Sequence, residues 1–341
     1  MAQISGNNRY TSYQIKINEK NLSSEQIKNE ILVPIKANRL QDCNVTNGSG
    51  FLPYSFGKED VKYTDKIEDS IYDNILVISH FSIHPKQRKK IDDNLQSQLI
   101  NEEGENSYNT AYMRKILLQD FYDQFTQDLI FIERDESLIL TFPSNNPEFV
   151  LDKNLKFYFN KSVIIEHYIK NNRINSEIFN WLIWDIKKEK DGRIGDIVIN
   201  SIDEFSSSPL LTTGNLKLKL DEIDQSIYPK LASNLGSSHN NITMEISYQE
   251  KKYKFNLQTG GSFTPIWGGC SGYSTGNNKT SRLLYLRDIC TKIIPGISDH
   301  FLTVEKDWIK NKDVILSQLI EEVILAICTK EQILQILNKM E

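Results

Sequence analysis

The chain has 341 residues, of which 39% are hydrophobic, and its formal net charge at pH 7 is −5. This length and composition allow one large hydrophobic core or two modest ones, so stability requires neither a disulfide nor a structural metal. The negative net charge excludes a chain that binds polyanions through its overall charge, although a local basic groove remains compatible with it.

Two further features of the composition limit the class of protein. The four cysteines are scattered without a CxxC pair, which argues against a zinc ribbon or a disulfide framework. No apolar run approaches the roughly 20 residues that a membrane-spanning helix needs, and the N-terminus lacks the apolar segment of a secretory signal. We therefore expect a cytoplasmic protein with no membrane partner.

The first half of the chain predicts strands and helices in mixed order. Residues 12–18 alternate like an exposed strand, and Ser23 and Gln26 form a capping-box pattern for a helix that ends near Lys36. Residues 73–83 are β-branched and bounded by polar residues, which is typical of a strand. The other predicted elements are helices at 86–101 and 109–127, a hairpin of strands 129–133 and 137–142, a strand at 155–159 and a helix at 162–170.

The second half begins with a predicted hairpin. Its arms are residues 181–187 and 194–200, and its turn holds Asp191 and Gly192, which supply the positive φ that tight hairpins need. The elements predicted after it are strands at 216–220, 242–248 and 253–257, and helices at 280–294, 304–328 and 329–339.

These elements predict an α/β or α+β fold in which helices flank a mixed β-sheet with hairpins. We expect residues 1–278 to form the sheet core, which could be a single domain. Residues 279–341 are expected to pack on that core as a helical C-terminal region.

A glycine-rich segment, residues 258–278, lies between the last predicted strand and these helices and holds six of the 16 glycines. A segment of this length without periodicity is usually a binding or catalytic loop. Phe263, Trp267 and Tyr273 would form its contact surface, and the alternative is a loop that the same aromatic residues pack over the edge of the sheet. The predicted ligand-loop residues are Gly268, Gly269, Cys270, Gly272 and Gly276.

Cys270 has small neighbours that would let a substrate reach a thiolate. A cysteine nucleophile needs a base, and His239 or His300 would have to supply it. This interpretation predicts a hydrolase or transferase. The alternative is a buried cysteine that acts as a small hydrophobic residue.

Carboxylates and a lysine around the predicted middle hairpin form a third candidate site. Asp185 and Lys187 would share one face of a strand, and Glu148 or Asp152 lies upstream. This arrangement resembles the PD-(D/E)xK nuclease superfamily, which includes type II restriction endonucleases. The resemblance implies a Mg²⁺-dependent, site-specific DNA endonuclease in which Asp185 and Glu148 or Asp152 bind the metal and Lys187 positions the attacking water. The alternative is a solvated hairpin with no catalytic role.

Basic residues could contact the DNA backbone in such a nuclease. The most basic run of the chain follows the strand at 73–83, and one further lysine directly follows the glycine-rich segment. These predicted DNA-binding residues are Lys86, Arg88, Lys89, Lys90 and Lys279. A homodimer formed through the C-terminal helices would suit a palindromic site. A non-catalytic binding or scaffold protein that uses the aromatic residues of the glycine-rich segment remains the other open interpretation.

Overall fold

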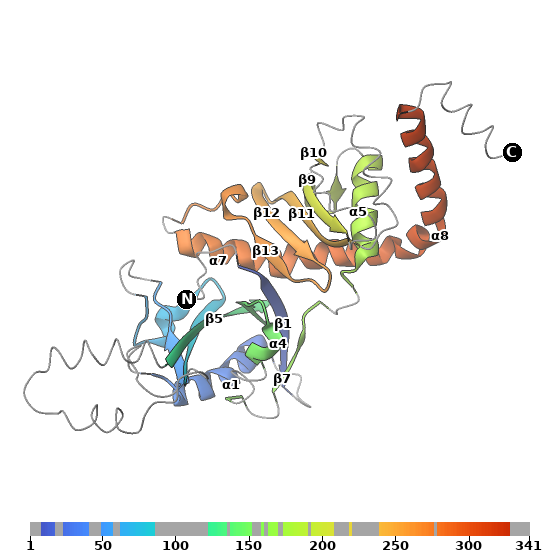
Figure 1. Ribbon diagram of the computed structural model, residues 1–341. Coiled ribbons are helices and arrows are strands. Elements are labelled where there is room, and N and C mark those ends of the chain that lie inside the picture. Colours follow the sequence, from blue (N-terminus) through green and yellow to red (C-terminus); the bar gives the residue numbers. More distant parts are fainter. Residues whose placement is uncertain are drawn as a thin grey trace, which may run out of the picture. The chain divides into compact units, whose positions relative to one another are not determined.

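The computed structural model divides the chain into two compact units (Figure 1). The N-terminal unit holds Met1–Gln3 and Ile15–Ile165, and the C-terminal unit holds Ile4–Gln14 and Glu166–Glu341. The residues that the structure describes are 8–17, 23–40, 49–56, 62–85, 122–134, 137–151, 158–159, 163–169, 173–189, 192–207, 218–219, 239–275 and 278–327. The C-terminal helices thus belong to the same unit as strands that precede them.

The N-terminal unit contains an antiparallel sheet whose strands follow the order β2–β4–β5–β6. Its buried centre is the β4–β5 pair, where Val77 lies opposite Ile130 and both side chains are inaccessible to solvent. The elements of this unit are α1 (Ser24–Ala37), β2 (Ser49–Pro53), a 3-10 helix (Ile67–Ser70), β3 (Ile71–Tyr72), β4 (Ile75–Pro85), β5 (Tyr122–Arg134), β6 (Ser137–Pro143) and α4 (Pro147–Phe149).

Helix α1 begins with the capping box that the sequence predicts. The Ser23 hydroxyl accepts a hydrogen bond from the backbone N–H of Gln26 at 3.3 Å, and the Gln26 side chain accepts one from the backbone N–H of Ser23 at 3.0 Å. Both bonds satisfy amide groups that have no partner within the helix. The apolar face of the helix is then buried through Ile27, Ile31, Leu32 and Ile35.

The variant Ser23→Ala is expected to lower the free energy of unfolding by about 1 kcal/mol, because it removes the side-chain acceptor of the capping box. Urea unfolding followed by circular dichroism measures this change. Ser274→Ala, a substitution at an exposed loop position, is the matched control and should stay within about 0.5 kcal/mol of the wild type. Equal stability of the two variants would show that the capping box contributes nothing.

The C-terminal unit contains a second antiparallel arrangement, in the order β10–β9–β11–β12–β13–β1. Strand β1 (Tyr10–Ile17) contributes its first residues to this unit, where Tyr10 pairs with Phe263. The other strands are β7 (Val163–His167), which begins in the N-terminal unit, β8 (Arg193–Ile194), β9 (Ile197–Ser207), β10 (Leu218–Lys219), β11 (His239–Tyr248), β12 (Lys251–Gln258) and β13 (Phe263–Pro265).

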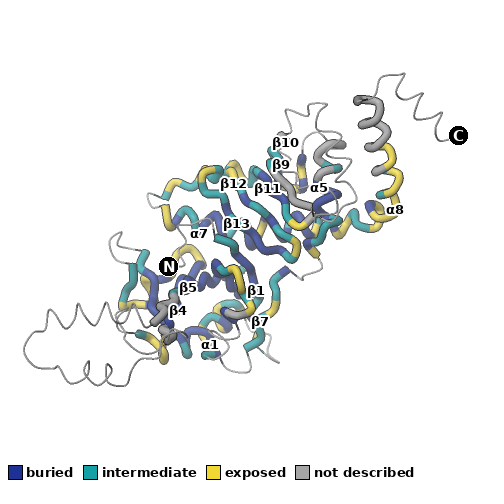
Figure 2. The backbone as a smooth tube through the Cα atoms, viewed as in Figure 1, coloured by how far each residue is buried: buried dark blue, intermediate teal, exposed yellow. Residues whose placement is uncertain are grey.

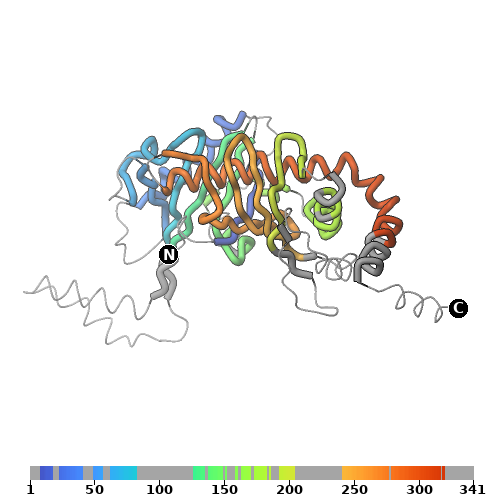
Figure 3. Tube along the Cα trace, turned by 90° about the horizontal axis from the view of Figure 1, so that it is seen from above, coloured from blue at the N-terminus to red at the C-terminus, as the bar shows by residue number. Residues whose placement is uncertain are grey.

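Helices cover this set of strands. They are α5 (Ser176–Glu189), a 3-10 helix (Trp267–Gly269), α7 (Asn278–Asp288), a π-helix (Ile289–Ile293) and α8 (Ile294–Ile327). Helix α7, the π-helix and α8 follow one another without a break, and Figures 1 and 3 show them running along the strands in orange and red. The described strands of this unit are largely buried, whereas most of the described side chains between residues 309 and 318 of α8 are exposed (Figure 2).

The α/β architecture with hairpins, flanking helices and a helical C-terminal region is confirmed. The strands predicted at 12–18, 73–83, 242–248 and 253–257, the hairpin at 129–142 and the helix that begins after Ser23 are also present. Of the strand predicted at 216–220, the structure describes residues 218–219, which form β10. No helix in the described part of the chain is long and apolar enough to cross a membrane.

The predicted middle hairpin is wrong, because residues 181–187 belong to α5. The Asn175 side chain caps this helix by accepting hydrogen bonds from the backbone N–H groups of Glu177 at 3.0 Å and Ile178 at 3.2 Å. The buried residues of α5 then recur at helical spacing, as Ile178, Phe179, Trp181 and Leu182. The tight hairpin of this region is instead β8–β9, with Gly195 at a φ of 59° in its turn.

Other predictions also need correction. Residues 122–127 form the start of β5 rather than the end of a helix, and residues 163–167 form strand β7 rather than a helix. The two helices predicted at 280–294 and 304–328 are parts of one continuous helical run. The predictions for 86–101, 109–121 and 329–339, and most of the strand at 155–159, lie outside the described residues.

Candidate functional site: a tryptophan pocket

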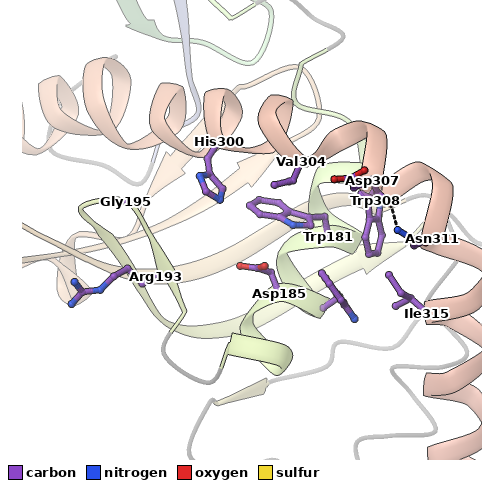
Figure 4. A pocket seen from close by; sticks show the side chains of 11 residues that line it. Trp181, Asp185, Arg193, Gly195, His300, Val304, Asp307, Trp308, Asn311 and Ile315 are labelled. Atoms are coloured by element: carbon purple, nitrogen blue, oxygen red, sulfur yellow. Dashed lines mark hydrogen bonds between the residues drawn. The ribbon is translucent and has the colours of Figure 1, made fainter.

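A pocket of about 630 Å³ opens in the C-terminal unit beside α5, α8 and the β8–β9 turn (Figure 4). Ligand sites commonly have volumes of roughly 300–1,000 Å³, with aromatic walls and a few polar groups. The lining residues are Trp181, Trp184, Asp185, Arg193, Gly195, His300, Val304, Asp307, Trp308, Asn311 and Ile315. Three of the four tryptophans of the chain therefore line one pocket.

Aromatic contacts hold α5 and α8 together around the pocket. The Trp181 ring lies 5.4 Å from Phe301 and 5.7 Å from His300, and the Trp184 ring lies 5.6 Å from Trp308, all measured between ring centroids. Trp181 is only 2% exposed and Trp308 only 3%, whereas Trp184 is partly exposed. Trp184 is thus the tryptophan whose ring surface is most available to a ligand.

Glu177 of α5 holds Trp308 in position and forms an ion pair with Lys312 of α8. The Trp308 indole N–H donates a hydrogen bond to Glu177 Oε2 at 3.1 Å, and Lys312 Nζ lies 2.5 Å from Glu177 Oε1. A buried indole N–H needs an acceptor, so Glu177 sets the orientation of the ring. The aromatic wall of the pocket is therefore held in place before any ligand binds.

Charged groups line the rest of the pocket. Asp185 comes from α5, Asp307 and His300 come from α8, and Arg193 comes from β8. Figure 4 shows the Asp185 carboxylate pointing from α5 toward the side where Arg193 and Gly195 lie. The described lining thus carries two carboxylates and one guanidinium beside the imidazole of His300.

The described residues of the predicted nuclease site lie on helices α4 and α5 and not on strands. Asp185 lines the pocket, but residues 185–187 belong to helix α5, and a helix does not place alternate residues on one face as a strand does. The prediction that Asp185 and Lys187 share one face of a strand is therefore wrong. Glu148 is an exposed residue of α4 in the N-terminal unit, and Asp152 lies outside the described residues.

The structure does not test the predicted metal site. Within the described ranges, no group of three or more His, Cys, Asp and Glu side chains could hold a metal ion. Asp185, Asp307 and His300 line one pocket without forming such a group, and the Mg²⁺ site stays a prediction. Of the predicted DNA-binding residues, Lys279 is exposed on α7, whereas Lys86, Arg88, Lys89 and Lys90 lie outside the described residues.

The glycine-rich segment is mostly packed against the C-terminal unit. Phe263 is a buried residue of β13, Trp267 lies beside the Arg282 guanidinium at 5.2 Å, and Ser271 pairs with Lys252 of β12. Gly269 and Gly272 lie against Lys254 and Lys251, so a Cβ atom at either would come within 3.0 Å of a lysine side chain. This packing agrees with the alternative interpretation only in part, because residues 263–265 form a strand paired with β12 and β1 rather than a loop over the edge of the sheet. Gly268 is exposed, and Gly276 lies outside the described residues.

Cys270 has surroundings that oppose thiolate formation. Its sulfur accepts a hydrogen bond from the backbone N–H of Lys254 at 3.5 Å and donates to the carbonyl of Ile266 at 3.7 Å. Burial raises the pKa of the thiol, and the hydrogen bond from Lys254 only partly offsets this effect. His300, one of the two bases considered for it, stacks on Trp181 in the pocket. A raised pKa counts against a nucleophilic cysteine.

In a protein whose Cys43 and Cys328 are replaced by serine, iodoacetamide is expected to alkylate both remaining cysteines slowly at pH 7. The reasons are the raised pKa of Cys270 and the burial of Cys290, which is 1% exposed. Mass spectrometry of timed samples gives the rates, and labelling in urea gives the rate for exposed thiols. One cysteine that reacts at the urea rate in the folded protein would restore the nucleophile interpretation.

A buried network of polar side chains joins the glycine-rich segment to α7. Asp288 accepts hydrogen bonds from the hydroxyls of Tyr253, at 2.6 Å, and Tyr273, and from Arg287 Nε at 3.2 Å. Burial and the contact with Asp288 raise the pKa of Tyr273 to about 12 and raise that of Tyr253 further. Both hydroxyls therefore stay protonated and act as donors at neutral pH.

Comparison with known proteins adds no assignment to this geometry: the sequence matches no protein-family model and no curated protein.

Of the residues that line the pocket, the sequence predicts a role only for Asp185 and, as a base for Cys270, for His300. The other pocket residues of α8 are not predicted. A signal for them was present. Val304, Asp307, Trp308, Asn311 and Ile315 follow the spacing of one helical face. Polar residues and a tryptophan alternate with apolar residues on that face, which is unusual for a face that only fills a core.

Proposed function

We propose that the C-terminal unit binds a small organic molecule in the tryptophan pocket. The observation that carries this proposal is the lining itself, in which three tryptophans and several charged groups surround about 630 Å³. Apolar walls exclude water from part of a ligand, and a few fixed polar groups orient it. The ion pair of Glu177 with Lys312 keeps this wall rigid, which lowers the entropic cost of binding.

Filling the pocket tests this proposal. Val304 lines the pocket from α8, so Val304→Phe should occlude it without removing a core side chain. Val314→Phe is the matched control, because Val314 lies on the same helix, is 58% exposed and is outside the lining. A library of metabolites screened by thermal shift should yield ligands that stabilise the wild type and Val314→Phe but not Val304→Phe. Ligands that stabilise all three proteins equally, or none at all, would contradict the proposal.

A Mg²⁺-dependent DNA endonuclease, acting as a homodimer, is the second proposal. The observation in its favour is that Asp185 shares one pocket with a second carboxylate, Asp307, and with His300. Its test is incubation of the purified protein with plasmid and phage DNA, with and without Mg²⁺, followed by electrophoresis. Discrete Mg²⁺-dependent fragments that Asp185→Asn abolishes would support it. Intact DNA under both conditions, or cleavage that Asp185→Asn leaves unchanged, would contradict this use of Asp185.

A further inference from the structure

We infer that the ligand of the tryptophan pocket carries an organic cation, such as an alkylated ammonium group. This inference rests on the proposed binding function and adds the chemical class of the ligand. Three observations carry it: the partly exposed ring of Trp184, the two carboxylates of the lining, and the rigid support behind the ring.

The ring of Trp184 is suited to a cation. Tryptophan has the most favourable aromatic face for a cation, which is attracted when it lies within about 6 Å of the ring centroid. Trp308 packs beside Trp184 with a centroid distance of 5.6 Å, so the two rings form an aromatic corner with Trp184 as its accessible part. The Trp308 side of this corner is held in place by the hydrogen bond from its indole N–H to Glu177.

The charges of the lining also favour a positively charged ligand. Asp185 and Asp307 bring two carboxylates, and among the lining residues Arg193 is the one permanent cation. Arg193 is an exposed residue of β8, so its charge is better screened by solvent than that of the half-buried Asp185. A phosphate or carboxylate ligand would meet net repulsion, whereas an organic cation would be attracted by both carboxylates and by the Trp184 ring.

A quaternary ammonium group also suits the aromatic corner formed by Trp184 and Trp308. An alkylated ammonium spreads its charge over methyl groups, so removing its water of hydration costs less free energy than for a primary ammonium when it enters an apolar corner. Asp185 and Asp307 then balance the charge without a close hydrogen bond. A free quaternary ammonium compound and a trimethylated lysine side chain share this chemistry, and the experiment separates them.

The test compares a cation with its neutral isostere. Choline and 3,3-dimethylbutan-1-ol differ in one atom and one charge, so titration of each into the full-length protein, followed by tryptophan fluorescence, isolates the effect of the charge. We expect choline to bind about fivefold more tightly or better. N-acetyl-trimethyllysine amide, titrated in the same way, shows whether a lysine side chain is preferred to the free cation.

Variants then assign the effect to the carboxylates. Asp185→Asn and Asp307→Asn should each weaken choline binding several-fold while leaving the affinity for the neutral alcohol unchanged. Asp313→Asn is the matched control, because Asp313 is an exposed aspartate of α8 outside the lining. Equal affinities for choline and the alcohol would overturn the inference and leave the binding pocket intact. The inference would also be overturned if neither probe bound, or if only Asp313→Asn weakened binding. The proposed binding function itself fails only if Val304→Phe changes no ligand response.

Discussion

Replacement of Asp288 by alanine is expected to lower the free energy of unfolding by about 3 to 5 kcal/mol. The side chain of Asp288 is 8% exposed and accepts hydrogen bonds from Tyr253, Tyr273 and Arg287. Truncation leaves two hydroxyls and a guanidinium N–H in or near the core without their acceptor. The cost of such unsatisfied donors is larger than the net contribution of the bonds themselves.

Urea unfolding followed by near-ultraviolet circular dichroism measures this loss, since Tyr253 and Tyr273 contribute to the signal. Asp299→Ala is the control, because that aspartate of α8 is 66% exposed and pairs with Arg173 at the surface. Surface ion pairs contribute about 0–1 kcal/mol, so the control should remain close to the wild type. A loss below about 1 kcal/mol for Asp288→Ala would mean that water replaces its hydrogen bonds.

The tyrosines of this network also give stability a dependence on pH. Their pKa values are raised in the folded state, to about 12 for Tyr273, above the ordinary tyrosine value of 10.0. The folded state therefore favours the protonated hydroxyls, and the associated stability is fully present below pH 10 and is lost as the pH rises toward 12. Asp288→Ala should shift the alkaline absorbance titration of Tyr273 to lower pH, because it removes one cause of the raised pKa.

Elements with a local signal could be predicted from the sequence. Helix α1 begins at a capping box whose two hydrogen bonds depend only on Ser23 and Gln26. The β11–β12 hairpin was recognised from its two alternating arms, although its turn uses Gln249 and Glu250 at φ values of 48° and 62° rather than a glycine. Where one short segment determines the structure, the pattern of residues was sufficient.

The failures arise where local patterns are ambiguous or where contacts are distant. The apolar run around Trp181 is compatible with a buried strand or a helix, and the cap at Asn175 that decides the question lies six residues earlier. The pocket itself joins Asp185 of α5 to Asp307 of α8, residues that are far apart in the sequence. No local periodicity specifies which faces of two distant helices pack together, so the site needed the structure.

Replacement of Trp181 by alanine is expected to lower the free energy of unfolding by about 3 to 5 kcal/mol. Trp181 is 2% exposed and packs against Phe301 and His300, so truncation would leave a large cavity between α5 and α8. Thermal unfolding of the variant measures the loss. Trp267→Ala is the matched control, because Trp267 is partly exposed and lies beside Arg282, a contact that contributes about 0.5–1 kcal/mol.

The comparison with Trp184→Ala separates the structural tryptophan from the one that would contact a ligand. Trp184 is partly exposed, so its truncation should cost less stability than that of Trp181 but should remove the accessible face of the aromatic corner. Trp181→Phe, which preserves much of the buried volume, should retain ligand binding, whereas a folded Trp184→Ala protein should lose it. If Trp184→Ala bound the choline probe as the wild type does, the aromatic corner would serve only to pack α5 against α8, and the charge of the lining alone would have to account for any preference for cations.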